Sequence, residues 1–396
     1  MPFRIALSGL NSFSSSLRST SNNIANAGTT GFKRARSEFA DVYAGSQGTG
    51  VQVAANSKQF NQGNIEFTGN TLDMAINGQG FFRMSDNGTT VYTRAGNFHL
   101  DREGYITNNQ NQRLTGFQAD TSGNITGALG ELQLDSTGIS PGATSRIDLG
   151  LNLDARETVP ATPFDPNDSQ SYNHSASISV YDSLGNQHDM TLYFAKTGDN
   201  AFDMHAFVDG NQVLSGSSLQ FSSGGQITSP ASPAEVTIPA FDPGGGAASQ
   251  SITIDMQDIT QYGSSFSMNS ATQDGFGAGN PSTFDISNTG VISARYSNGQ
   301  SRTIGQVALA NFVNPQGLTQ LGNTSFGESY DSGTALVGTP DGGSLGALQS
   351  GALETSNVDL AEGLIGLILT SHHLQAQMKV IQTAEKTIGS LFDERA

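Results

Sequence analysis

The chain lacks cysteine and tryptophan and has few basic residues: 18 Lys and Arg stand against 35 Asp and Glu among 396 residues. Without cysteine, neither a disulfide nor a thiolate metal site can form. A formal net charge of −17 argues against nucleic acid or anionic lipid as the main partner, because phosphate binding needs a basic face. We therefore predict no nucleic-acid binding.

Long hydrophobic runs are also missing. The most apolar stretch, residues 363–369, is far too short to span a bilayer, so we predict no membrane insertion. The first ten residues contain one Arg and no apolar core of the length that a secretory signal requires. We therefore expect no cleaved signal peptide, and an extracellular protein of this kind would need another export route.

What the chain has in abundance is glycine, with 48 residues, together with Ser, Thr, Asn and Gln. Short apolar alternations separated by turn residues fill the middle of the chain, which is typical of turn-rich β structure. Charged residues make up only 13% of the chain, so a charge-driven disordered state is not indicated.

The N-terminal 27 residues follow a heptad pattern that predicts a helix with an a/d seam. Pro2 suits the first helical position and Gly28 suits the stop, so the helix would be about 37 Å long. The predicted assembly residues on it are Phe3, Ala6, Leu10, Phe13, Leu17 and Ile24.

The C-terminal 38 residues repeat this pattern, and Asp359 with Glu362 resembles a capping box at the start. One predicted row contains Leu360, Leu367, Leu374, Ile381 and Ile388; the second contains Leu364, Ser371, Met378, Glu385 and Phe392. The apolar members of both rows are the predicted assembly residues of this helix. Exposed apolar seams are costly in water, so we expect both ends to be poorly ordered in a free monomer and to fold as subunits stack.

These patterns predict a multidomain α+β protein in which terminal α-helices form a coiled-coil-like domain and enclose two nested, mainly β domains. The predicted parts are a helical assembly domain (1–28 and 358–396), an extended connecting segment (29–70), an inner β-domain (71–145 and 285–357) and an outer β-domain (146–284).

Three separate motifs resemble those of the flagellar rod and hook protein family. The first comprises Asn22, Asn23, Ile24, Ala25 and Asn26 followed by Gly31 and Phe32; the second comprises Gly78, Gly80, Phe81 and Phe82; the third comprises Asn357 and Asp359 at the start of the last helix. Their order, at opposite ends of the chain, makes the resemblance specific. Residues 181–188 and 260–263 resemble the outer domain of hook proteins, which favours a hook protein over a distal rod protein.

The resemblance implies a non-enzymatic structural subunit that polymerises into a flexible, hollow extracellular tube, the universal joint between motor and filament. The implied partners are copies of itself, the distal rod protein, the hook cap, the hook–filament junction protein and the flagellar type III export apparatus. No cofactor is implied.

Other interpretations remain open from the residues alone. The seams could belong to ordinary core helices, and the β-rich middle would also suit a surface adhesin or carbohydrate-binding protein. A distal rod or hook-associated protein is the alternative within the family. A phosphate loop at Gly78–Gly80, a histidine metal site and a glycosidase pair drawn from Asp182, Asp189 and Asp203 are each weakly supported.

Overall fold

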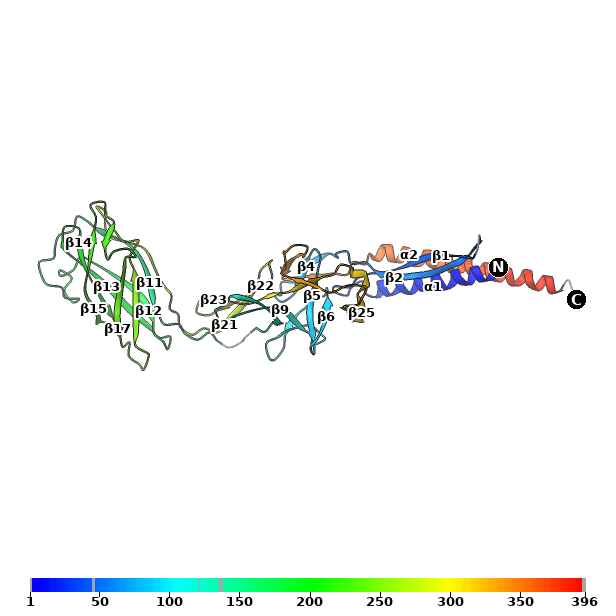
Figure 1. Ribbon diagram of the computed structural model, residues 1–396, viewed down its shortest axis with the longest axis horizontal. Helices are drawn as coiled ribbons and strands as arrows, with labels where there is room; N and C mark the ends of the chain where they lie inside the picture. The colour runs from blue at the N-terminus through cyan, green and yellow to red at the C-terminus, as the bar shows by residue number, and fades with distance from the viewer. Residues whose placement is uncertain (1, 45–46, 121, 135–137, 394–396) are drawn as a thin grey trace. The chain divides into compact units, whose positions relative to one another are not determined.

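The computed structural model describes residues 2–44, 47–120, 122–134 and 138–393, and it describes no side chains for Pro2, Ala44, Gln47 and residues 388–393. The chain divides into two compact units. Unit 1 is built from Met1–Asp135, Thr283–Ala294 and Ser301–Ala396, and unit 2 from Ser136–Ser282 and Arg295–Gln300. Each end of the described chain is helical and the part between is mainly β, as predicted (Figure 1).

Within unit 1, the two terminal helices α1 (Pro2–Ala25) and α2 (Leu360–Asp393) pack against each other in antiparallel orientation. Near one end a Cβ atom added to Gly363 would lie 3.1 Å from Ile24, and near the other a Cβ added to Gly9 would lie 3.1 Å from Gln377. The small glycines allow the helix axes to approach closely at both points.

The start of α2 is capped as the sequence predicted. Asp359 Oδ1 accepts hydrogen bonds from the backbone N–H groups of Ala361 at 2.8 Å and Glu362 at 3.1 Å. These donors have no partner inside the helix, so the cap fixes where α2 begins. Glu362 does not complete the reciprocal capping box, because its carboxylate pairs with Arg34 at 2.8 Å.

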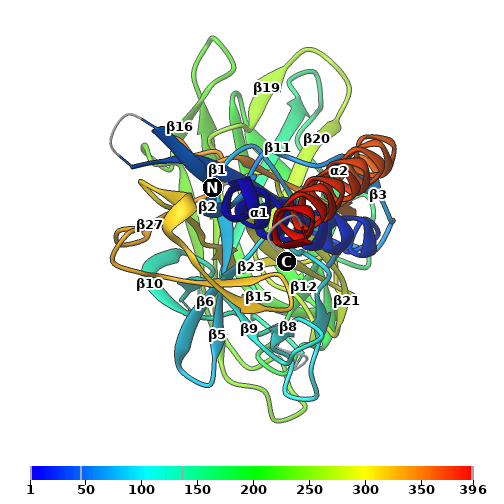
Figure 2. The ribbon, with the colours of Figure 1, turned by 90° about the vertical axis from the view of Figure 1, so that its right-hand side faces the viewer.

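Residues 29–70, which we expected to form an extended connection, contain a long antiparallel hairpin instead. Strands β1 (Ala35–Ala44) and β2 (Gln47–Lys58) pair along their length and lie on α1 (Figure 2). Val51 N–H donates to Ser8 Oγ at 3.2 Å. A two-stranded ribbon is marginal alone, so packing against α1 stabilises it in a way that local sequence does not reveal.

The rest of unit 1 is a β-domain in which the outgoing and returning chains pair. Strand β29 (Ala352–Glu354) pairs with β3 (Ile65–Phe67), and β28 (Ala347–Ser350) pairs with β4 (Met74–Asn77). The other strands are β5 (Phe81–Asp86), β6 (Thr89–Thr93), β7 (His99–Leu100), β8 (Ile106–Thr107), β9 (Arg113–Ala119), β10 (Ile125–Glu131), β23 (Ser301–Val307), β24 (Leu309–Asn311), β25 (Thr319–Gly322), β26 (Ser325–Gly327) and β27 (Leu336–Gly338), with a 3₁₀ turn at Pro315–Gly317. Together with β21 (Pro281–Ile286) and β22 (Val291–Tyr296), these strands form one 13-stranded sheet.

Unit 2 consists of two five-stranded sheets that share one apolar core. The first sheet has the order β17–β18–β11–β19, with β20 also paired to β11, and the second has the order β12–β13–β14–β15–β16. The strands are β11 (Arg146–Asp154), β12 (His174–Tyr181), β13 (Gln187–Gly198), β14 (Ala201–Val208), β15 (Asn211–Phe221), β16 (Ile227–Ser229), β17 (Glu235–Phe241), β18 (Gln250–Asp255), β19 (Thr260–Tyr262) and β20 (Ser267–Gln273).

A histidine links two turns at one end of the second sheet. His188 Nδ1 lies 2.6 Å from Asp209 Oδ2, and its Nε2 lies 3.4 Å from Asp182 Oδ2. Asp182 also accepts the backbone N–H groups of Leu184 and Asn186, which is the turn role expected from the sequence. The hydrogen bond to Asp209 raises the pKa of His188. Although burial opposes it, the bonds from Asn186 and His188 lower the pKa of Asp182 to about 2.

We expect this link to make the stability of unit 2 pH-dependent. A raised histidine pKa stabilises the fold fully below the unfolded value near 6.5 and loses its effect as pH rises through the folded pKa. Burial lowers the pKa of His174 and His205 in the same unit, which opposes this trend, so the His188 contribution must be read as a difference between variants. The urea midpoint of the parent should exceed that of His188→Gln most between about pH 4 and 6, and this difference should shrink as pH rises above about 6.5, whereas His99→Gln in unit 1 should leave the midpoint of unit 2 unchanged.

Candidate functional site

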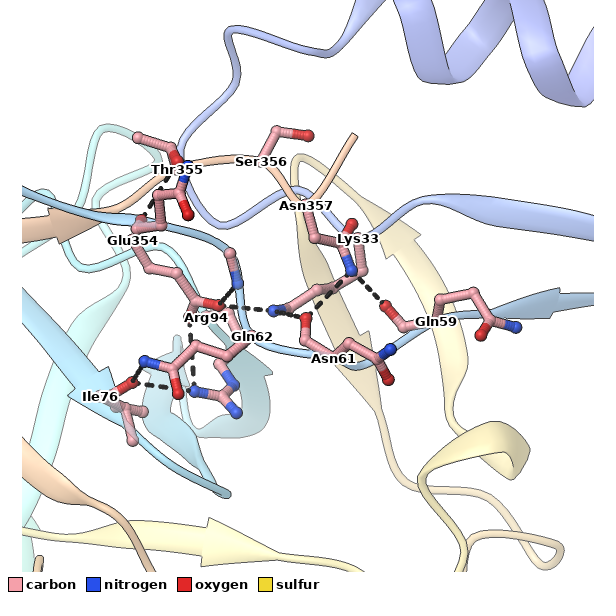
Figure 3. Close-up of polar contacts among 12 residues, drawn as sticks. Lys33, Gln59, Asn61, Gln62, Ile76, Arg94, Glu354, Thr355, Ser356 and Asn357 are labelled. Carbon is pink, nitrogen blue, oxygen red and sulfur yellow. Dashed lines mark hydrogen bonds and ion pairs between the residues drawn. The ribbon is translucent and has the colours of Figure 1, made fainter. Parts of the chain in front are cut away.

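The three family-like motifs meet at a buried ionic cluster beneath the terminal helices, formed by Lys33, Arg94 and Glu354 (Figure 3). Lys33 Nζ lies 2.6 Å from Glu354 Oε1, and Arg94 NH1 lies 3.3 Å from Glu354 Oε2. Lys33 is 1% exposed and Glu354 is 0% exposed. One carboxylate thus pairs with two cations from distant parts of the chain.

Backbone groups complete this ionic cluster. Glu354 Oε1 also accepts the N–H of Gly63 at 2.8 Å, Lys33 Nζ donates to the carbonyl of Asn61 at 2.8 Å, and Arg94 NH2 donates to the carbonyl of Gly78 at 2.6 Å. Burial lowers the pKa of Lys33, and the charge of Glu354 opposes that shift. Burial likewise lowers the pKa of Arg94, again opposed by Glu354. The single carboxylate therefore offsets the cost of burying both cations.

Two motif asparagines hold the chain where it enters and leaves the helical part. Asn23 exchanges two hydrogen bonds with the backbone of Ala35, at 2.7 and 2.8 Å. Asn357 accepts the N–H of Arg34 at 2.8 Å and donates to the carbonyls of Gln59 and Asn61. Each side-chain amide thus bonds to backbone N–H and C=O groups in the way that a neighbouring strand would.

The remaining motif residues are structural. Gly31 adopts a φ of +67° and donates its N–H to the carbonyl of Glu354 at 2.8 Å. Phe81 and Phe82 are buried in the two apolar clusters of the β-domain. Asn22 and Asn26 lie at the end of α1, where the side chain of Asn26 donates to the carbonyl of Asn22 at 2.9 Å. Exposed positions on that last turn include Asn22 and Ala25.

None of the three members of the ionic cluster was predicted as a site residue from the sequence. Lys33 directly follows Phe32 of the first motif, Glu354 precedes Asn357 of the third by three residues, and Arg94 lies between the second motif and β7. A charged residue beside an otherwise apolar or amide motif was the available signal. The sequence could not show which charged residues pair, because Glu354 lies more than 200 positions from both of its partners.

On α1 the predicted row faces its neighbours only in part. Ala6 is buried, and Phe13 packs between Phe39 of the hairpin and His373 of α2, with ring centroids 6.2 and 4.9 Å away. The half-buried members are Leu10, Leu17 and Ile24. Phe3 is 42% exposed and lies beyond this packing.

On α2 only one of the two predicted rows faces α1. The half-buried members of that row are Leu367, Leu374 and Ile381, and the row beside it is formed by Gly363, Thr370, Gln377 and Ala384. The second predicted row points largely away from α1, since Leu364 and Met378 are exposed, although Ser371 is half-buried. Leu360, the first member of the other row, is also exposed. The side chains of Ile388 and Phe392 lie outside the described residues. Gly363 and Thr370 lie at the contact with α1 in place of larger side chains, because small residues permit a closer approach of the helices.

An exposed apolar surface results, which we call the outer face of α2. It consists of Leu360, Leu364, Ile365, Ile368 and Leu369, each between 51% and 60% exposed. Five exposed apolar side chains gathered on one helix make this face a candidate interaction surface. Among the described residues, α1 and α2 included, no helix is long and apolar enough to cross a membrane, and no group of three or more acidic or histidine side chains could hold a metal ion.

Comparison with known proteins gives matches along nearly the whole chain. Four family descriptions match in order: flagella basal body rod protein at 3–33, the flagellar hook protein FlgE/F/G D1 domain at 75–145, the flagellar basal body protein FlaE D2 domain at 152–276, and the flagellar basal body rod FlgEFG protein C-terminal region at 349–393. The flagellar hook protein FlgE of Escherichia coli K12 is 35% identical over all of both chains.

The chain belongs to the flagellar hook protein family. Hook proteins of Salmonella typhimurium and Borreliella burgdorferi are 34% and 30% identical, covering 100% and 97% of this chain. The crystal structure of Helicobacter pylori hook protein FlgE2 shares the fold, with a TM-score of 0.56 over 73% of this chain and all of that one, at 14% identity. As a member of this family the chain is a structural subunit of the bacterial flagellum, and it assembles with rod and hook proteins there.

Proposed function

We propose that the chain polymerises through its terminal helices into the hollow, flexible tube of the hook, which transmits torque from rod to filament. The observation that carries this proposal is the outer face of α2, whose five apolar side chains are more than half exposed in a single chain. Covering the exposed half of each would contribute roughly 0.8–1.5 kcal/mol, half of the value for full burial. Contacts with other chains would supply that burial.

In this proposal, residues 1–28 and 358–396 form a coiled-coil-like assembly domain, and 29–70 connects it to an inner β-domain (71–145 and 285–357). The outer β-domain (146–284) is an excursion from the inner one. Glycine- and serine-rich polar surface suits outer contacts that exchange partners as the hook bends, because water can bridge them. Cross-links between outer domains should then raise the bending stiffness of the hook.

The partners in this proposal are copies of the chain, the distal rod protein, the hook cap and the hook–filament junction protein. Export would use the flagellar type III apparatus without a cleaved signal peptide, and the final location would be the extracellular hook. The subunit would carry no cofactor and catalyse no reaction.

Assembly through the outer face can be tested with Ile368→Glu. A charge at the centre of an apolar contact must be desolvated, so this variant should form no tubes where the parent chain does. The assay is electron microscopy of purified chain in a strongly excluded salt, which favours apolar burial. Because Ile368 is exposed in the single chain, the free energy of unfolding of the variant should stay within about 0.5 kcal/mol of the parent value.

Gln375→Glu is the matched control, since it adds the same charge one heptad along, at an exposed position that is already polar. It should assemble like the parent. Tubes of normal yield from Ile368→Glu would refute the proposed role of this face. A truncated chain lacking both terminal helices should likewise yield no tubes.

A further inference from the structure

The first two turns of α1 present a second unpartnered surface. Phe3, Ile5 and Leu7 are each 42% exposed. Arg4 is exposed among them, and no ion pair involves it within the described residues. The helix has no acidic residue at all. This end of α1 is therefore apolar and positively charged.

The outer face of α2 has the opposite charge at its edge. From residue 359 to residue 378 the chain contains two carboxylates, Asp359 and Glu362, and no Lys or Arg. Arg34 pairs with Glu362, whose side chain is nevertheless 67% exposed. Apolar area and charge sign thus complement those of the start of α1.

These two surfaces cannot meet within one chain. The helices are antiparallel, and Ile24 rather than Phe3 lies beside Gly363. Phe3 is about 20 residues farther along α1, or about 30 Å at 1.5 Å per residue. Figure 1 shows the same arrangement, with the N-terminus of α1 at the far end of the helix pair from the start of α2.

We infer that the start of α1 in one copy packs on the outer face of α2 in the next copy, with Arg4 beside the Asp359–Glu362 edge. This inference rests on the proposed assembly through the terminal helices and names the partner surface of that same site. Because the two surfaces differ, the contact is heterologous and leaves one of each free at the ends, so it propagates into a filament.

The absence of cysteine permits a direct cross-linking test. Tubes of Ile5→Cys/Leu364→Cys should, on mild oxidation, give a ladder of disulfide-linked multimers on a non-reducing gel, because adjacent Cβ atoms can form the bond. Mixed Ile5→Cys and Leu364→Cys single variants should give a dimer that neither forms alone. Ile5→Cys/Gln375→Cys, with the second cysteine off the patch, should give no ladder.

The outcomes separate the two proposals. Tubes of the double variant without a ladder would overturn the head-to-tail contact and leave assembly through α2 intact. If the parent chain formed no tubes, both would fail. Arg4→Glu tests the charge: it should lower the dimer yield of the mixed single variants several-fold at low salt, and the difference should vanish near 1 M salt, where screening is nearly complete. An unchanged low-salt yield would contradict the placement of Arg4.

Discussion

Glu354→Gln should destabilise unit 1 by about 3–5 kcal/mol, because it leaves two buried cations without their carboxylate. The amide preserves the shape of the side chain, so the loss reports charge and not volume. Lys33 can escape part of the penalty by losing its proton. The deficit should therefore shrink as pH rises toward 10, where the lysine is increasingly neutral in both folded and unfolded chains.

Hydrogen exchange resolved by peptide is the suitable measurement, since it reports unit 1 and unit 2 separately. Protection should fall in β3, β4 and β29 and stay constant in β12 and β13. Glu66→Gln is the control, because Glu66 is exposed and pairs across the ladder with Leu353, the neighbour of Glu354. A loss below about 1 kcal/mol, the level of an exposed ion pair, would show that the cluster contributes little.

Gly31→Ala should be nearly as damaging, at about 2–5 kcal/mol, because it combines two costs. The φ of +67° is unfavourable for any residue with a Cβ atom. A Cβ at this position would also lie 2.4 Å from the backbone nitrogen of Ala95 and 2.6 Å from the carbonyl carbon of Arg94. Neither contact can relax by a side-chain rotation, so β29 or the segment around Arg94 must move.

Gly28→Ala provides the comparison three residues earlier. No heavy atom lies within 4 Å of its added Cβ, and its φ is not left-handed. It should change the free energy of unfolding by less than about 0.5 kcal/mol. Equal urea midpoints for the two variants would mean that the close approach at Gly31 is not maintained in solution.

Much of the candidate site could be predicted from local pattern. The heptad rows placed helices at both ends, and Asp359 marked the start of α2, because periodicity and capping depend on residues a few positions apart. Asn23, Gly31 and Asn357 were selected as motif residues, and each makes a contact that only its side chain, or the lack of one, allows.

Other features were beyond such reasoning. The heptad pattern alone could not decide between the adjacent rows of Leu364 and Gly363, since α2 has apolar residues on both sides of its contact with α1. The hairpin β1–β2 was expected as a connection, because its stability comes from α1 and not from its own residues.

By itself, then, the sequence determined the two terminal helices, the cap of α2 at Asp359 and the family, because all three depend on short-range periods and motifs. The tertiary structure decided which face of α2 is left uncovered, and it brought Lys33, Arg94 and Glu354 together. The physical reason is the same in both cases. Which helix faces pack together depends on how closely the two surfaces can approach, and a buried charge is stable only where the fold brings its partner to it. Both depend on residues that are far apart in the sequence.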